Sequence, residues 1–333
     1  MSSRFEIART KMEPGTKNRN YLRVGPYFHH KRAYIRRYVL IPFTIIRGRE
    51  HGPTLVQTAG CHPTEYAGID ATITLANTIK PEDLKGTYIA VHCVNTLGFS
   101  ERTYLNPIDG KNIHELYPGR ADGTISEMIA YRLFNEIVLK ANYFLDCHGG
   151  DIHESEIWSV IYHVANDDAE KKSEAIARAT GITYIDGPKN RPGTMGMEAA
   201  KRGIPGAQFE ISSGDRLLPE ESSAIVNGTL NVLRHLKMLP GAPKPIQGQP
   251  GTVAGQEQEI WTSRAVGYFR HGGLYHTNVR PGDILKEGQV IGTVTDWWGE
   301  VVETIYSPGT GRVAQLIHNP VVLPGDTAIE VVS

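Results

Sequence analysis

The chain lacks three features that would assign it to a specialised class of protein: an excess of charge, a long hydrophobic run and many cysteines. Its 333 residues carry 35 Lys and Arg against 36 Asp and Glu, which gives a formal net charge of −1. Such a balance gives no electrostatic reason to bind nucleic acid or an anionic membrane. No apolar run reaches the roughly 18 residues of a membrane-spanning helix. We therefore expect no membrane and no nucleic-acid partner.

The cysteines and the first residues predict where the protein works. Cys61, Cys93 and Cys147 each lie in or beside an apolar, strand-like run, and nothing in their spacing indicates a disulfide framework. The N-terminal stretch, Met-Ser-Ser-Arg-Phe-Glu-Ile-Ala-Arg, lacks the apolar centre of a signal peptide. Both observations predict a cytoplasmic protein, and a homo-oligomer is left open.

What the chain does have, from about residue 36 to residue 238, is an alternation of apolar runs and helical periodicity. Buried strands separated by helices predict an α/β fold with a mixed, mostly parallel sheet flanked by helices. The predicted strands are 38–46, 54–58, 87–94, 143–146, 157–163 and 207–211, and the predicted helices are 65–79, 126–139, 167–180 and 219–236.

The last third of the chain has another character. Residues 241–258 are rich in Pro and Gly, as expected for a linker. Short apolar runs between Gly and Pro turns follow, which predicts a small all-β domain over 259–333 that resembles the hammerhead of lipoyl and biotinyl domains. The Met-Lys-Met-type tip that carries a covalent cofactor is missing, so we expect a structural or lid role. The predicted catalytic domain is 1–240.

Two short motifs point to a metal. His62 and Glu65 stand three residues apart at a strand-to-helix turn, and His148 ends an apolar strand before Gly149-Gly150. Two imidazoles and one carboxylate are a common ligand set of a catalytic zinc whose fourth position stays open for water. The pair of His62 and Glu65 alone is better explained by a surface histidine and a glutamate in the first turn of a helix. Together the two motifs predict one Zn²⁺ per subunit, held by His62, Glu65 and His148.

A carboxylate that could act as a general base ends another predicted strand. Glu210 follows Ala207-Gln208-Phe209 and precedes a Gly-containing turn, a position from which a side chain can reach an activated water. The alternative is an ion pair with Arg202 or Arg216. Asp146, two residues before His148, points to the same face of its strand and either orients that histidine or caps the turn.

The order of these motifs resembles the succinylglutamate desuccinylase/aspartoacylase family, relatives of the zinc carboxypeptidases that act as N-acyl amino acid deacylases. The resemblance rests on the motifs already named together with Arg102, 107–112, 117–119, 193–194 and 203–205. It implies a carboxypeptidase-like fold, zinc held by the three predicted ligands and Glu210 as general base. It also implies that Arg102 polarises the scissile carbonyl and stabilises the oxyanion.

One departure from the family concerns the substrate. Family members carry an Asn-Arg pair before the Tyr/Phe-Pro-Gly, where the Arg grips the substrate's carboxylate, but here His114 and Glu115 follow Asn112-Ile113. Glu115 inverts the charge at this place. We therefore expect Arg102, Asn112, His114 and Glu115 to bind a substrate that presents an amide, an amine or another neutral or cationic group. The alternative is that another arginine, among Arg120, Arg191 and Arg216, supplies the carboxylate clamp.

The predicted function is zinc-dependent hydrolysis of an amide bond in a small N-acylated amino acid or a related amide or amine. The first alternative is carboxypeptidase-type cleavage of a short peptide, which the missing carboxylate-binding Arg disfavours. The second is a non-catalytic, ligand-binding member of the family. A complete hydrolytic set argues against the second alternative, since a binding protein needs no general base.

Overall fold

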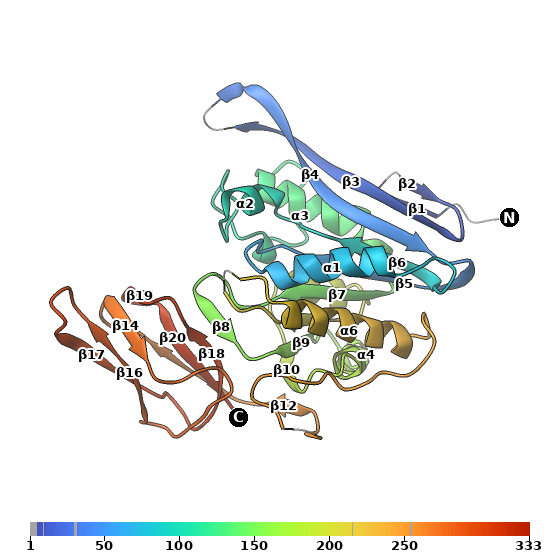
Figure 1. Cartoon of the computed structure of the whole chain (residues 1–333). Coiled ribbons are helices and arrows are strands. Elements are labelled where there is room, and N and C mark those ends of the chain that lie inside the picture. The colour runs from blue at the N-terminus through green and yellow to red at the C-terminus, as the bar shows by residue number, and fades with distance from the viewer. Residues whose placement is uncertain (1–4, 9, 30–31, 215, 254) are drawn as a thin grey trace.

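The computed structural model describes residues 5–8, 10–29, 32–214, 216–253 and 255–333. Figure 1 shows a large sheet covered by helices and, beside it, a smaller all-β part formed by the C-terminal third of the chain. The fold class predicted from the sequence, a mixed sheet flanked by helices followed by an all-β region, is confirmed. Among the described residues no helix is long and apolar enough to cross a membrane.

The large sheet has nine strands in the order β12-β10-β9-β11-β7-β5-β6-β4-β3. Its centre is parallel, and β11 against β9, β6 against β4 and β4 against β3 are antiparallel. The strands are β3 (Thr16–His29), β4 (Arg32–Arg47), β5 (Glu50–Ala59), β6 (Lys85–Val91), β7 (Tyr143–His148), β9 (Ser159–His163), β10 (Tyr184–Lys189), β11 (Gly206–Glu210) and β12 (Glu259–Trp261).

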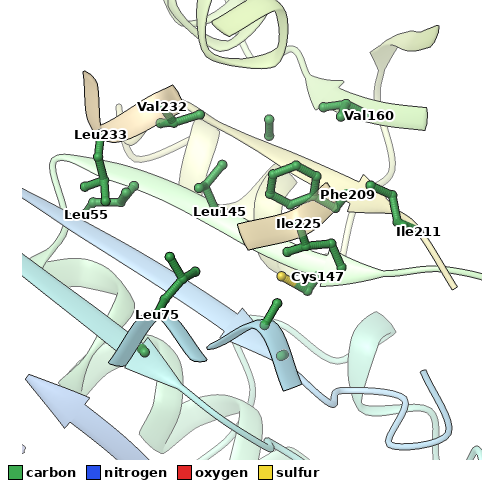
Figure 2. Packing of buried hydrophobic residues seen from close by; sticks show 14 of the residues in the cluster. Leu55, Leu75, Leu145, Cys147, Val160, Phe209, Ile211, Ile225, Val232 and Leu233 are labelled. Atoms are coloured by element: carbon green, nitrogen blue, oxygen red, sulfur yellow. The ribbon is translucent and has the colours of Figure 1, made fainter. Parts of the chain in front are cut away.

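Helices cover both faces of this sheet. One face carries α1 (Tyr66–Thr78), α4 (Asp167–Ala179) and α6 (Pro219–His235), and the other carries α3 (Ile125–Glu136) and α5 (Met195–Ala200). Each face has its own buried core, and Figure 2 shows Leu145 and Cys147 of β7 packed against Ile225 and Val232 of α6. The remaining helical elements are α2 (Thr96–Glu101) and two 3-10 turns, η1 (Ile113–Glu115) and η2 (Val138–Lys140).

The C-terminal part consists of two small sheets around a third apolar core. One sheet has the order β13-β20-β18-β15 and the other β17-β16-β14-β19. Their strands are β13 (Arg264–Tyr268), β14 (Gly273–Thr277), β15 (Ile284–Leu285), β16 (Val290–Thr295), β17 (Val301–Tyr306), β18 (Gly311–Ile317), β19 (Val321–Val322) and β20 (Thr327–Val332).

Two strands join the large and the small part. β8 (Glu154–Glu156) leaves the large sheet after β7 and pairs with β18, with Glu156 opposite Gln315. β12, at the start of the range assigned to the β domain, pairs with β10 of the large sheet. The connecting segment packs against the large part, since Gln249 is buried and hydrogen bonded to Thr183 just before β10. The domain boundaries therefore stay a prediction, and the two parts share a continuous interface.

The sequence missed the N-terminal hairpin. Apart from residues 38–46, which make up the second half of β4, neither β3 nor β4 was predicted, although they pair over most of their length. Two short elements, β1 (Phe5–Ile7) and β2 (Thr10–Met12), precede them. Residues 16–20 of β3 are all polar and alternation appears only at 22–24, so this edge strand with one exposed face contains no apolar run that would predict it.

Candidate active site

The three predicted metal ligands converge because their strands are neighbours. β5 and β7 pair in parallel, with Ala59 opposite Cys147, so their carboxyl ends lie at the same edge of the sheet. His62 lies in the turn after β5, Glu65 is the N-cap residue of α1, and His148 is the last residue of β7. Gly149 lets the chain turn here, since a Cβ on it would lie 2.4 Å from the backbone nitrogen of Ser212.

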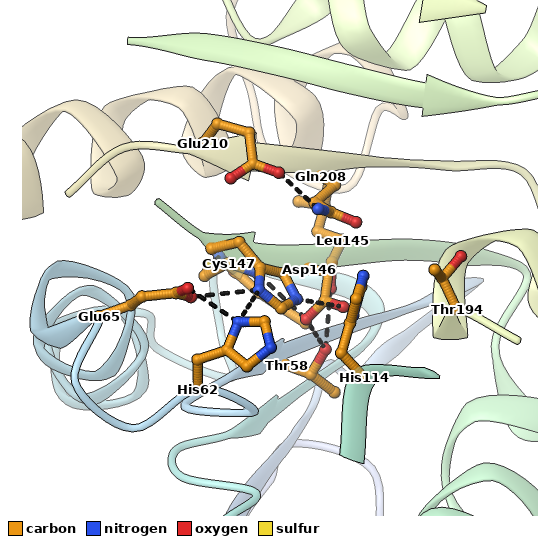
Figure 3. A network of polar contacts seen from close by, with 12 residues as sticks. Thr58, His62, Glu65, His114, Leu145, Asp146, Cys147, Thr194, Gln208 and Glu210 are labelled. Atoms are coloured by element: carbon orange, nitrogen blue, oxygen red, sulfur yellow. Dashed lines mark hydrogen bonds and ion pairs between the residues drawn. The ribbon is translucent and has the colours of Figure 1, made fainter. Parts of the chain in front are cut away.

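The ligand atoms face one another at short range. The Nδ1 atom of His62 lies 2.8 Å from Oε1 of Glu65, and the Nδ1 atoms of His62 and His148 are 3.1 Å apart. The second carboxylate oxygen of Glu65 is 3.1 Å from Nδ1 of His148, yet it is buried and makes no hydrogen bond. All three side chains are buried, and Figure 3 shows the contacts of His62 and Glu65 as dashed lines.

The electrostatics of this cluster favour a positive charge at its centre. Burial opposes ionisation of Glu65, but His62 and His148 hold the pKa of its carboxyl below the usual range. Burial likewise disfavours a charged His148, but the carboxylates of Asp146 and Glu65 raise the pKa of its imidazole well above the usual range. Either a proton or a metal ion can supply the positive charge that these carboxylates favour.

Hydrogen bonds on the far side of each imidazole fix which nitrogen faces the cluster. The Nε2 atom of His62 lies 3.0 Å from Oδ1 of Asn112, and Nε2 of His148 lies 3.2 Å from Oδ2 of Asp146. Asp146 is itself held by the hydroxyl of Thr58, which donates at 2.5 Å. With both Nε2 atoms committed to these oxygens, the two Nδ1 atoms are free to act as ligands.

These observations fit a zinc site. The facing nitrogens, the buried carboxylate oxygen without a hydrogen bond and the oriented imidazoles are what a zinc ion with two histidines and one carboxylate requires. The ligand atoms of His62, Glu65 and His148 all lie within 4.8 Å of one another. A second group with the same spacing consists of His114, Asp146 and His148, but Asp146 already orients His148 in the first.

A cavity of about 270 Å³ opens from the metal cluster and contains Glu210. Glu210 is opposite His148 in the register of β11 and β7, so both side chains lie on the same face of the sheet. The amide of Gln208 donates to Oε1 of Glu210 at 2.5 Å, as Figure 3 shows. Burial, the largest influence, raises the pKa of Glu210 to about 7, which suits a group that takes up and releases a proton near neutral pH.

The structure does not bring Arg102 to this cavity. Arg102 caps the C-terminus of α2 with a φ of +56°, and its side chain is exposed and does not line the cavity. Tyr104, two residues later, does line it and stacks on His62 with ring centroids 4.0 Å apart. Burial raises the pKa of Tyr104, which keeps its hydroxyl protonated. Tyr104 was missed because it lies in a loop, where no periodic pattern indicates which way a side chain points.

The predicted substrate residues 112–115 do reach the cavity. Asn112, His114 and Glu115 all line it. His114 is buried, and its Nδ1 atom has no hydrogen-bond partner. Glu115 is exposed at the mouth and shares it with Arg191. Of the three arginines considered for the carboxylate clamp, Arg191 lines the cavity, whereas Arg120 and Arg216 do not.

The far wall of the cavity comes from the C-terminal part, for which the sequence predicted a structural or lid role. Ala314 and Gln315 of β18, Glu330 of β20 and Arg264 of β13 line it, opposite Trp261 of β12. The guanidinium of Arg264 forms ion pairs with Asp186 and with Glu330 and thereby ties β13 and β20 to β10. The C-terminal part therefore completes the cavity.

Comparison with known proteins agrees with the family resemblance expected from the sequence. The family model of the Succinylglutamate desuccinylase/Aspartoacylase catalytic domain matches residues 51–236. The chain is 29% identical over 268 residues to the N-alpha-acetyl-L-2,4-diaminobutyric acid deacetylase of Halomonas elongata, which covers 78% of this chain and 75% of that protein.

Two solved structures extend the likeness over both parts of the chain. A crystal structure of a succinylglutamate desuccinylase/aspartoacylase from Rhodobacter sphaeroides has 25% identity and a TM-score of 0.85, with 95% of each chain covered. The product-bound structure of the ectoine utilization protein EutE (DoeB) from Ruegeria pomeroyi has 22% identity, the same TM-score and the same coverage, and shows the shared fold.

Proposed function

The chain belongs to the succinylglutamate desuccinylase/aspartoacylase family, and on that premise we propose that it is a zinc-dependent hydrolase that cleaves the amide bond of a small N-acylated molecule. The observation that carries the proposal is the convergence of His62, Glu65 and His148 in a cavity that also holds Glu210. A non-catalytic binding protein would need the ligands but no buried, poised carboxylate beside them. The curated relative is a deacetylase, which supports the same reaction class.

A zinc ion held by His62, Glu65 and His148 would supply Lewis-acid chemistry: it would polarise a carbonyl and lower the pKa of bound water. The residues of the chain do the rest. Glu210 accepts a proton from the attacking water at its carboxylate and returns it to the nitrogen of the leaving amine. Gln208 holds the Glu210 carboxylate in place through its 2.5 Å hydrogen bond. Asn112 and Asp146 keep His62 and His148 in their orientations.

The group that stabilises the oxyanion is proposed to be Tyr104. A protonated phenol hydroxyl in a buried wall donates a hydrogen bond to a developing negative charge without reorganisation. The role predicted for Arg102 stays a prediction that its exposed position does not support. Arg191 is the guanidinium at the cavity mouth and is a second candidate for contact with the substrate.

The substrate class follows from the same cavity. Its lining is mostly polar and its volume is about 270 Å³, which suits a small molecule better than a polypeptide. N-Acetylated diamino acids are the first compounds to assay, because the curated relative is named for one. Glu115 and Arg191 are both exposed and both line the cavity. Glu115→Arg tests whether Glu115 repels a substrate carboxylate: if it does, the variant should hydrolyse free-carboxylate substrates faster than the wild type.

The decisive experiment combines metal analysis with a conservative variant. The purified protein is expected to contain one zinc per chain, and Glu210→Gln is expected to keep the zinc while losing about 10²- to 10⁴-fold in kcat. The matched control is Glu220→Gln, an exposed residue in the first turn of α6. A metal-free protein, or a Glu210→Gln variant as active as the wild type, would overturn the proposal. The cytoplasmic location stays a prediction that fractionation can test.

A further inference from the structure

The cavity is much longer than the metal cluster requires. Its lining residues lie on five neighbouring strands of the large sheet, β7, β11, β9, β10 and β12. At about 4.8 Å between strands, four steps span about 19 Å. The register places the lining side chains on one face: His148, Glu210 and Ser159 form one row, and Ile161, Asp186 and Trp261 form the next. A subsite therefore extends well beyond the reaction centre.

Most charged groups in the far part of the cavity have a partner. Arg264 pairs with both Asp186 and Glu330, and Lys189 lies 2.8 Å from Asp186. These ion pairs neutralise that wall, so it offers little net charge to a ligand.

Glu156 is the exception. It lines the cavity from β8, and within the described part of the chain its side chain makes no hydrogen bond and no ion pair. After burial, the charges of Glu210 and Glu154 are the main causes that hold the pKa of Glu156 well above the usual range. The positive charge of Arg264 lowers the pKa of Glu156, although the two side chains form no ion pair. Carboxylates crowded in this way favour a cation among them.

A second observation in the same wall points to a ligand. Trp261 is 4% exposed and lines the cavity, yet its indole Nε1–H has no acceptor. A buried donor without a partner is costly, and it is satisfied by a polar ligand or by the water that accompanies one. Ile157, Ile161 and Ala314 also line the cavity and supply it with apolar surface.

We propose that the cavity beyond Glu210 binds a protonated amine against Glu156, so that the substrate is an N-acylated molecule with a second, positively charged nitrogen, such as an acylated α,ω-diamine. This inference rests on the proposed function for the reaction and on Glu156 for the selectivity. The apolar lining accommodates the methylene spacer, while the carboxylate of Glu156 accepts hydrogen bonds from the ammonium. Because β8 pairs with β18, the C-terminal part fixes the position of this carboxylate.

The first test measures binding without catalysis. Isothermal titration of the zinc-loaded, full-length protein compares α,ω-diamines of three to six carbons with the primary monoamines of the same length. Both series present one amine to the reaction centre, and the diamines alone present a second to Glu156. At least one diamine is expected to bind ten times more tightly than its monoamine. Equal affinities throughout the series would overturn the inference.

The variant Glu156→Gln keeps the shape of the side chain and removes its charge. It is expected to reduce the advantage of the diamine to less than twofold and to leave the affinity for the monoamine unchanged. Glu287→Gln, an exposed residue of the C-terminal part, is the matched control and should keep the full advantage. If Glu156→Gln weakens both amines equally, the residue has a structural role and the inference is wrong.

The second test measures selectivity in turnover. The mono-N-acetyl diamine is compared with the N-acetyl alkylamine and with the N-acetyl ω-amino acid of equal length. The wild type is expected to favour the cationic amide by at least tenfold in kcat/KM, and Glu156→Gln should abolish that preference. Hydrolysis of all three amides at equal kcat/KM leaves the proposed function standing and refutes the inference. Diamine binding that depends on Glu156 without hydrolysis of any amide refutes the proposed function and leaves the subsite standing.

Discussion

The two ends of the cavity are built in different ways. At the metal end, every ligand comes from the carboxyl edge of two adjacent parallel strands, and each histidine has a hydrogen-bond partner behind it. At the far end, the wall is assembled from strands that lie far apart in the sequence, β8, β12, β13, β18 and β20. With a cation bound, the second carboxylate oxygen of Glu65 at the metal end has a partner, whereas at the far end the side chain of Glu156 and the indole N–H of Trp261 remain unpaired among the described residues. Chemistry and selectivity therefore reside in separate structural units.

The largest expected effect comes from removing a ligand at the metal end. His148→Ala should lose stoichiometric zinc and at least about 10³-fold in kcat/KM, because a site with two ligands binds the ion weakly and loses its catalytic chemistry. Metal analysis by mass spectrometry and steady-state kinetics measure both. The exposed His51 provides the control, since His51→Ala should change neither quantity. A His148→Ala protein with full zinc and full activity would contradict the metal assignment.

A smaller loss is expected at the proposed oxyanion donor. Tyr104→Phe removes one hydroxyl and keeps the ring that stacks on His62, so it should lower kcat by about 10²-fold with little change in KM. Tyr268→Phe, at an exposed tyrosine, should behave as the wild type. If the loss falls in KM alone, Tyr104 binds the substrate in the ground state and another group stabilises the oxyanion.

The hydrogen bonds behind the ligands should have a smaller effect again. Asp146→Asn leaves the side chain in place but weakens the support of His148, so the zinc affinity should fall by about 10- to 100-fold. Competition with a chelator of known affinity measures this change. Asp122→Asn, at an exposed aspartate, should not alter the affinity. An unchanged zinc affinity in Asp146→Asn would show that Asp146 serves the strand end and not the ligand.

The smallest effect is a pH-dependent change in stability at the far end. The folded-state pKa of Glu156 is raised, so its ionisation costs stability, and this cost is absent at pH 4 and increases as the pH rises. Glu156→Gln removes the ionisable group. The variant should therefore unfold about 2 °C above the wild type at pH 8 and show no such gain at pH 4.

Calorimetry of the metal-free protein at pH 4 and pH 8 measures the difference in unfolding temperature between variant and wild type. The control variant Glu287→Gln should show no gain in unfolding temperature at either pH. A gain of the same size at both pH values would mean that packing, and not charge, is responsible. The charge of Glu156 would then not destabilise the far end, and this difference from the metal end would disappear.

Local sequence signals were enough for the metal end. Runs of apolar residues predicted β5 and β7, whose parallel pairing brings His62, Glu65 and His148 to one edge. Glu210 was found in the same way, because it ends an apolar strand. Each of these residues lies within a few positions of a buried strand, and each of those strands can be predicted from its own run of apolar residues. The local sequence pattern is therefore sufficient to place them at the strand ends.

The far end could not be derived in this way. Whether Tyr104 or Arg102 enters the cavity depends on one left-handed residue at the end of α2. Whether Glu156 faces Gln315 depends on the pairing of β8 with β18, which are more than 150 residues apart. Arg264 and Trp261 lie in a segment that reads as the start of a separate domain. No local pattern encodes such contacts, because long-range pairing is decided by the packing of whole sheets.

The sequence by itself thus determined the α/β fold class, the candidate metal ligands and the candidate base, because all of these follow from periodicity and from residues at strand ends. The tertiary structure alone decided the shape and charge of the cavity beyond them. The reason is physical: a ligand set needs a few donors around one ion, whereas a subsite is the space left between surfaces that meet only when both parts of the chain are folded.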